Sequence, residues 1–258
     1  MSYLAKILES TRTRLAEAKQ RVTVEALEQR LAGIDEPSSL RAALDGPDLA
    51  VIGEIKRASP SAGVFDANLS ATETAMAYAR GGAAAISVLT EPEFFKGSLD
   101  DLTSARTAGL PVVRKDFILD TWQVLESRAA GADALLLIVR ALEQRELETL
   151  LAACRTLRMD ALVEVYDDVE MTAALEAGAT IVGVNNRDLD SFEVDRERTI
   201  RLAPQVPEGV ILVGLSGVST RSDVEELGAA GAQAFLVGET LVRAADPAAE
   251  LRALRGES

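Results

Sequence analysis

The stretch GADALLLIVR, residues 131–140, places a Gly-Ala step directly before a continuous run of apolar residues. A glycine just past a helix end readily adopts the left-handed backbone conformation that terminates many helices. A short, continuously apolar run is typical of a parallel strand that helices cover on both sides. The stretch therefore predicts a helix end followed by a buried parallel strand.

The Gly-Ala step recurs before other apolar runs along the chain. It appears at 81–85, 178–180 and 231–234, each time between a segment with helical periodicity and a strand-like run. The starts of successive runs lie about 20 to 35 residues apart, which is the length of one strand–helix unit. The expected strands are 49–58, 84–91, 111–118, 134–140, 160–167, 180–189, 210–218 and 234–240.

Eight strand–helix units predict an α/β protein with the (β/α)8 TIM barrel architecture. A doubly wound sheet would typically have fewer strands and a G-x-G-x-x-G fingerprint after the first, and no such motif follows residues 49–58. Barrels of this kind commonly form one domain of about 200–250 residues, so the 258 residues predict a single domain.

Residues 1–47 precede the first expected strand and are interpreted as an N-terminal helical extension. One or two helices are followed by a loop at 33–39, where Ser38 or Ser39 can cap a further short helix. The extension is too small to have a core of its own. It either covers one end of the barrel or forms a wall of the substrate site, and the sequence leaves both roles open.

The composition excludes several kinds of catalytic site. The chain has no histidine and one cysteine, which rules out a Ser-His-Asp triad, a zinc site with histidine ligands, an all-cysteine metal cluster and an internal disulfide. Cys154 lies in an apolar helical segment and is interpreted as a buried structural thiol. Proton transfer near pH 7 is therefore left mainly to Lys, Glu, Asp and Tyr.

The chain is acidic, with 41 Asp and Glu against 27 Lys and Arg and a formal net charge of −14. The resulting field repels nucleic acid and anionic lipid, so we expect neither as a partner. No signal-peptide pattern opens the chain, and no run approaches the roughly 18 apolar residues of a membrane span. We expect a cytoplasmic protein, a monomer or weak homodimer, whose partner is a small-molecule substrate.

Charged residues interrupt several of the apolar strands near their carboxyl ends, where barrel active sites lie. Only five of the cationic residues are lysine, and Lys56, Lys96 and Lys115 are candidates because an ammonium, unlike a guanidinium, can change its protonation state. The alternation of strand side chains predicts which of the polar residues point inward. These are Glu54, Lys56, Lys115, Glu164, Asn185 and Arg187.

Two interpretations of these charges are open. They form structural ion pairs, such as Glu54 with Lys56 or Lys115 with Asp116, or they form one active site. The presence of such residues at the same end of several strands favours the active site.

The last two expected strands end in LSGVS (215–219) and VGET (237–240). Loops at these places in a barrel commonly bind phosphate through backbone N–H groups, and glycine permits close approach. Gly217 and Gly238, with Ser216 adjacent, are therefore candidate phosphate ligands. Phe95 follows the second strand, where its ring can pack against a flat substrate ring.

Several motifs together resemble the indole-3-glycerol phosphate synthase family. They are IGEIKRASPSAG (52–63), FFKGS (94–98), RKDFI (114–118), GADALLLIV (131–139), ALVEV (161–165), VGVNNRDL (182–189) and SGV (216–218). The resemblance runs in order from about residue 49 to 246. It implies conversion of 1-(2-carboxyphenylamino)-1-deoxyribulose 5-phosphate to indole-3-glycerol phosphate, a step of tryptophan biosynthesis, with loss of CO2 and water. It implies no metal and no organic cofactor.

The resemblance also implies roles for individual residues. Lys115 would be the general acid that protonates the ribulose carbonyl, and Glu164 would assist the later proton transfers and the dehydration. Lys56 would hold the anthranilate carboxylate or act in dehydration, while Glu54 and Asn185 would orient the substrate and the lysines. The residues implied to line the pocket are Ser59, Pro60, Phe95, Phe117, Leu136, Arg187 and Ser216, with Gly217 and Gly238 at the phosphate.

One position departs from the family pattern. The family commonly carries a glutamate immediately before the Ser-Gly of the seventh strand, where this chain has Leu215. Two alternatives to the synthase therefore stay open. One is a phosphate-ligand-binding barrel with impaired activity, and the other is a Schiff-base lyase or sugar-phosphate isomerase that uses Lys115 as a nucleophile.

Overall fold

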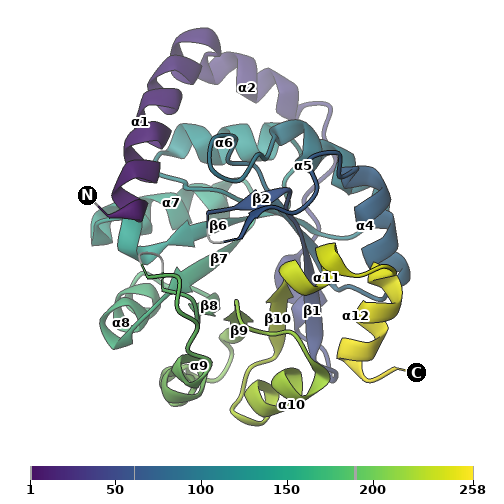
Figure 1. Ribbon diagram of the computed structural model, residues 1–258. Helices are drawn as coiled ribbons and strands as arrows, with labels where there is room; N and C mark the ends of the chain where they lie inside the picture. The colour runs from purple at the N-terminus through teal and green to yellow at the C-terminus, as the bar shows by residue number, and fades with distance from the viewer. Residues whose placement is uncertain (1, 61, 189–190, 258) are drawn as a thin grey trace.

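The computed structural model describes residues 2–60, 62–188 and 191–257. Over these residues, eight parallel strands close into a barrel in the order β1-β10-β9-β8-β7-β6-β5-β4 (Figure 1). Each strand lies within one of the expected ranges, so the prediction of a (β/α)8 TIM barrel is confirmed. Leu189, at the end of one expected range, lies outside the described residues. The strands are β1 (Ala50–Ile55), β4 (Ala85–Leu89), β5 (Val112–Lys115), β6 (Ala134–Ile138), β7 (Asp160–Val165), β8 (Ile181–Asn185), β9 (Ile211–Leu215) and β10 (Ala234–Val237).

Helices surround the barrel (Figure 1). They are α4 (Ala71–Arg80), α5 (Leu99–Ala105), α6 (Thr121–Ala129), α7 (Gln144–Thr156), α8 (Asp168–Glu176), α9 (Glu197–Leu202), α10 (Arg221–Ala229), α11 (Glu239–Arg243) and α12 (Pro247–Arg255), with 3-10 turns at Arg106–Ala108, Val139–Ala141 and Ala203–Gln205. At each of the four Gly-Ala steps a glycine with positive φ follows the helix, as predicted: Gly82, Gly131, Gly178 and Gly231. Among the described residues, no helix has the length and apolar character needed to cross a membrane.

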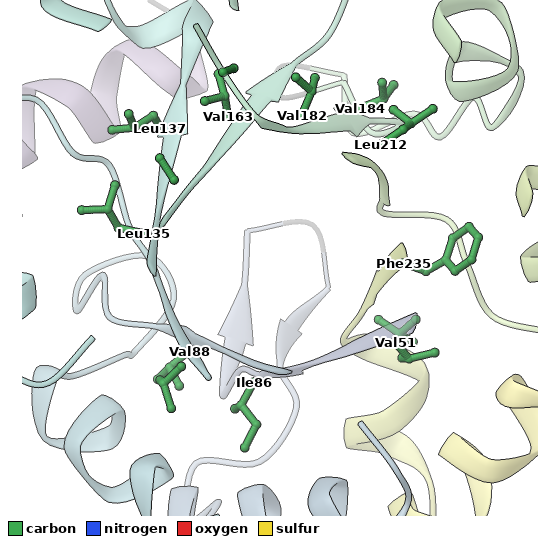
Figure 2. Packing of buried hydrophobic residues seen from close by; sticks show 14 of the residues in the cluster. Val51, Ile86, Val88, Leu135, Leu137, Val163, Val182, Val184, Leu212 and Phe235 are labelled. Atoms are coloured by element: carbon green, nitrogen blue, oxygen red, sulfur yellow. The ribbon is translucent and has the colours of Figure 1, made fainter. Parts of the chain in front are cut away.

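The strands divide the buried apolar residues into two layers. Side chains such as Leu135 and Leu137 project outward from the strands and pack under the helices, as Figure 2 shows. Leu136, between them in sequence, belongs to the cluster inside the barrel. Because the alternation is strict, Val113, Lys115 and Phe117 share the inner face of the barrel wall while Arg114 lies on the outer one.

The N-terminal extension contains three helices, α1 (Tyr3–Arg21), α2 (Val24–Leu31) and α3 (Leu40–Leu44). The Ser39 side chain caps α3, as one of the two sequence options predicts, by accepting a hydrogen bond from the Ala42 N–H at 3.1 Å. In α3, the Arg41 guanidinium donates to the carbonyls of Thr180 and Gly209, which precede β8 and β9. The start of α1 packs with the inner barrel cluster and lines the cavity described below. The extension therefore has both of the roles that the sequence left open, since α3 covers the amino end of the barrel and α1 forms a wall of the cavity.

A short antiparallel hairpin follows β1 and is not among the expected elements. It consists of β2 (Ala58–Ser59) and β3 (Gly63–Val64). Strands of two residues carry too little periodicity to be predicted from sequence. The hairpin places Ser59 over the carboxyl end of the barrel, where it lines the cavity.

Candidate active site

A cavity of about 490 Å³ opens at the carboxyl ends of the strands. It is large enough for a small organic ligand. Of the three candidate lysines, Lys96 is exposed and does not line this cavity. The structure brings the other residues that the sequence predicts for the site to the cavity wall. These residues are Glu54, Lys56, Ser59, Pro60, Phe95, Lys115, Phe117, Leu136, Glu164, Asn185, Arg187, Ser216, Gly217 and Gly238.

Glu54 and Lys56 form a closed ion pair at the end of β1. Lys56 Nζ lies 2.7 Å from Glu54 Oε1, and both side chains are largely buried. Burial raises the pKa of Glu54, but the charges of Lys56 and Lys115 and the hydrogen bond from Lys56 outweigh it, so the net pKa lies below its usual range. Gly238 makes room for the pair, because a Cβ there would overlap Glu54 Oε1 and lie 3.1 Å from Lys56 Nζ.

Lys115 and Glu164 form a second, more open pair. Lys115 Nζ is 3.8 Å from Glu164 Oε2, which is beyond hydrogen-bond range. Asn185 Nδ2 donates to Glu164 Oε1 at 3.0 Å and so orients the carboxylate. Glu164 Oε2 is buried, and no hydrogen-bond donor reaches it from the described part of the chain. A buried acceptor left unpaired is unusual and marks a place where a ligand can supply the missing donor.

The ion pair proposed between Lys115 and Asp116 is not formed. The Asp116 carboxylate instead accepts hydrogen bonds from Arg114 Nη2 at 3.0 Å and from the Thr90 hydroxyl at 2.6 Å. Neighbouring residues of a strand face opposite ways, so Lys115 and Asp116 separate even though they are adjacent in sequence. Lys115 is therefore available to a ligand in the cavity.

Backbone and cationic groups gather where β9 and β10 end. Ser216 and Gly217 have φ values of 63° and 78°, and a Cβ on Gly217 would lie 2.5 Å from Val194 Cγ1. Arg243, which the sequence analysis missed, lines the same part of the cavity, with its guanidinium 4.8 Å from the ring centroid of Phe65. Exposed backbone N–H groups, hydroxyls and a guanidinium can together hold a phosphate.

Aromatic and aliphatic side chains form another part of the wall. Phe95 and Phe117 pack with ring centroids 6.4 Å apart. Tyr3, which was not predicted from the sequence, contacts Phe94 and Phe192 edge to face, with ring centroids 5.6 and 5.4 Å apart. The position of Tyr3 depends on where helix α1 packs against the barrel. The amphipathic sequence of α1 does not predict that packing site. Further lining residues that were not predicted include Leu4, Ile7, Phe192, Ser219 and Thr240.

Leu215 ends β9 and lines the cavity next to β8. It pairs in register with Asn185, and its side chain packs against Gly183, where an added Cβ would lie 2.7 Å from Leu215 Cδ1. Its side chain is buried with the inner barrel cluster. Leu215 therefore adds apolar surface beside β8, the strand that carries Asn185, which binds Glu164.

Two further observations bear on the chemistry that the residues can support. Among the residues that the structure describes, no three His, Cys, Asp or Glu side chains are grouped to hold a metal ion. Cys154 is buried in α7 and does not line the cavity, and burial raises the pKa of its thiol to about 12. This thiol therefore stays protonated near neutral pH, as expected for a structural residue.

Comparisons with known proteins identify the family. A family model described as Indole-3-glycerol phosphate synthase matches residues 4–254. Indole-3-glycerol phosphate synthase of Parafrankia sp. is 48% identical over 248 residues, which cover 96% of this chain and 92% of that protein. The protein of the same name from Desulfosudis oleivorans is 50% identical over 205 residues, which cover 79% of this chain and 78% of that protein.

Among solved structures, 3-hexulose-6-phosphate synthase from Salmonella typhimurium superposes with a TM-score of 0.64 at 15% identity, covering 81% of this chain and 97% of that one. At this identity the likeness concerns the barrel fold alone. The match to the family model and the relatives over nearly the whole chain are decisive: the chain belongs to the indole-3-glycerol phosphate synthase family.

Proposed function

We propose that the cavity binds 1-(2-carboxyphenylamino)-1-deoxyribulose 5-phosphate and converts it to indole-3-glycerol phosphate, CO2 and water. The ring carbon that bears the carboxylate attacks the ribulose carbonyl and closes the five-membered ring. CO2 leaves from that ring carbon, and the oxygen of the former carbonyl leaves as water. The reaction makes this chain a carbon–carbon lyase of tryptophan biosynthesis.

Lys115 is the proposed general acid of ring closure. Its ammonium reaches into the cavity from the inner face of β5, beside the apolar wall formed by Phe95 and Phe117. Negative charge develops on the carbonyl oxygen as the carbon–carbon bond forms, and a positioned ammonium stabilises that charge and then transfers a proton. The observation that carries this proposal is the separation of Lys115 Nζ from Glu164 Oε2. At 3.8 Å the two atoms do not form a hydrogen bond with each other, so both can bind a ligand.

Glu164 is the proposed carboxylate of the later proton transfers. Its Oε1 is held by Asn185, whereas Oε2 is free to exchange a proton with the bound intermediate. Loss of water requires a proton on the departing oxygen and removal of a proton from the new ring. A fixed carboxylate beside an ammonium suits both transfers.

The anionic groups of the substrate are assigned to the cavity's cationic and N–H groups. Lys56, held by Glu54, and Arg187 can bind the anthranilate carboxylate, and Gly217 and Gly238 offer backbone N–H groups to the phosphate. Ser59, Pro60, Leu136 and Ser216 complete the lining. The formal charge of −14 argues against nucleic-acid and anionic-membrane partners. The proposal also includes action in the cytoplasm as a monomer or weak homodimer.

The test is turnover by the purified chain. With the carboxyphenylamino-deoxyribulose phosphate we expect indole fluorescence to appear, with one CO2 released per product. Binding of the substrate without product would instead support the phosphate-ligand-binding alternative. Borohydride added during turnover is expected to leave Lys115 unmodified, and a reduced covalent adduct on it would support the Schiff-base alternative.

A further inference from the structure

Arg198 is a buried cation that does not line the main cavity. It lies on α9, only 8% exposed, and its ion pair with Asp195 is long, with Nη2 3.7 Å from Asp195 Oδ2. A buried guanidinium with so loose a charge partner is costly unless its N–H groups are satisfied in another way. The contacts that satisfy them therefore indicate what Arg198 does.

The Arg198 guanidinium joins the ends of β7 and β8. Its Nη1 donates to the carbonyls of Asn185, at 3.1 Å, and Asn186, at 2.7 Å. Its Nη2 donates to the hydroxyl of Tyr166 at 2.8 Å, and its carbon lies 3.8 Å from the Tyr166 ring centroid. Asn185 ends β8, and Tyr166 directly follows β7, which carries Glu164.

Tyr166 is also held by a second arginine. The Arg140 guanidinium lies 4.0 Å from the same ring centroid, and its Nε donates to Glu170 Oε1 at 2.7 Å. The Tyr166 N–H donates to the other oxygen of Glu170 at 2.8 Å. Ring, hydroxyl and backbone of Tyr166 are thus all fixed, and the fixed residue is two positions from Glu164.

This cluster adjoins the Glu164–Asn185 pair. The residues lining a small cavity of about 10 Å³ include Arg140, Tyr166 and Glu170 of the cluster as well as Glu164 and Asn185. The ladder between β7 and β8 reaches Val165 and Val184. Beyond it, the hydrogen bonds of Arg198 join Tyr166 to Asn185 and Asn186 and so restrain the two strand ends where the ladder stops.

We propose that Arg198, with Tyr166 as its anchor, is a positioning residue that holds Asn185 so that its amide fixes the Glu164 carboxylate with Oε2 directed toward Lys115. The inference rests on the proposed function, in which Glu164 transfers protons. The proposed role of Arg198 is to keep Glu164 in position. Displacement of a catalytic group by about 1 Å can lower a rate on the order of 100-fold.

The first experiment compares Arg198→Gln with Arg201→Gln. Both residues lie on α9, but Arg201 is exposed and pairs with Asp195 at 3.0 Å. We expect Arg198→Gln to lower the single-turnover rate about 30-fold while KM changes less than about 3-fold, since binding groups elsewhere in the cavity are untouched. Arg201→Gln is expected to leave both unchanged. A wild-type single-turnover rate in Arg198→Gln would overturn the inference.

The second experiment tests whether Arg198 acts through Asn185. In an Asn185→Ala background, the further loss caused by Arg198→Gln is expected to shrink below about 3-fold, because coupled residues are not additive. Losses that multiply fully would overturn the inference. If Arg198→Gln does not fold, Tyr166→Phe replaces it, because this variant deletes only the hydroxyl that Arg198 binds. We expect Tyr166→Phe to lower the rate several-fold in the otherwise unmodified chain but not in the Asn185→Ala background. Equal losses in the two backgrounds would refute the inference. Failure of the proposed function is distinguishable, since it would appear as no product from the unmodified chain.

Discussion

Two lysine–carboxylate pairs lie in one cavity and differ in geometry. Glu54 and Lys56 lie on one strand end, and their charged atoms are 2.7 Å apart. Lys115 on β5 and Glu164 on β7 are separated by β6, and their charged atoms are 3.8 Å apart. A closed pair fixes the position of the ammonium, whose remaining N–H groups can hold an anion, whereas an open pair leaves a donor and an acceptor for the reacting atoms. Under the proposed function, the closed pair binds and the open pair catalyses.

The neighbours of each pair support this division. The closed pair has Gly238 against it, where a side chain would overlap the carboxylate. The open pair has Asn185 on one carboxylate oxygen and no hydrogen-bond donor, within the described ranges, on the other. Each of the following substitutions changes one pair and is expected to affect either rate or binding, but not both equally.

Lys115→Ala is expected to have the largest effect. Loss of the general acid removes charge stabilisation at the carbonyl oxygen, and kcat should fall at least about 1000-fold. The melting temperature is expected to change little, because Lys115 makes no closed ion pair. Steady-state kinetics with thermal melting checks this, and a near wild-type kcat would remove Lys115 from the mechanism.

Glu164→Gln is expected to have the next largest effect. The amide keeps the shape of the side chain but cannot exchange a proton, so kcat should fall about 100-fold with a smaller rise in KM. Kinetic constants measured over a substrate series separate the two parameters. If KM rises more than kcat falls, Glu164 belongs to binding and the division between the pairs is wrong.

Gly238→Ala tests the closed pair. The added Cβ overlaps Glu54 Oε1, so the pair must shift, and we expect KM to rise about 10-fold while kcat falls less. Gly46→Ala is a matched control because no atom lies within 4 Å of a Cβ at that position. An unchanged KM, or a loss confined to kcat, would contradict a binding role for Glu54 and Lys56.

The charges of both pairs could be predicted from sequence because each interrupts an apolar strand of known alternation. Period-2 patterning placed Glu54, Lys115 and Glu164 on the inner face, and the structure agrees. Tyr3 and Arg198 could not be predicted, since both lie on helices whose residues show no sign of which strand end they meet. The distances within the pairs also depend on the tilt of the strands, which the sequence pattern does not express.

Leu215→Glu is expected to change the rate by several-fold, less than the preceding substitutions. The new carboxylate would lie on β9 beside Asn185 and would compete with Glu164 for its amide. Leu215 is buried but borders the cavity, so the longer carboxylate can extend into that cavity, and the melting temperature should move less than the rate. Initial rates of product formation and the melting temperature, each measured for the variant and the unmodified chain, check this. An unchanged rate would show that leucine at this position is neutral for catalysis.

The smallest expected effect is on the pH dependence of stability through Glu54. Its pKa in the folded chain is lowered, with the neighbouring Lys56 and Lys115 charges outweighing burial, so the unfolded chain binds a proton more readily than the folded one. The ionised carboxylate therefore contributes stability above the ordinary glutamate pKa, and this contribution is lost as the pH falls through the lowered value. In urea denaturation, Glu54→Gln should be less stable than the unmodified chain at pH 7, and the difference should narrow below about pH 4.5. The exposed Glu28 in α2 supplies the control, since Glu28→Gln should leave stability unchanged at both pH values. A difference that widens on acidification would mean that burial dominates at Glu54 and that the closed pair is not held by charge.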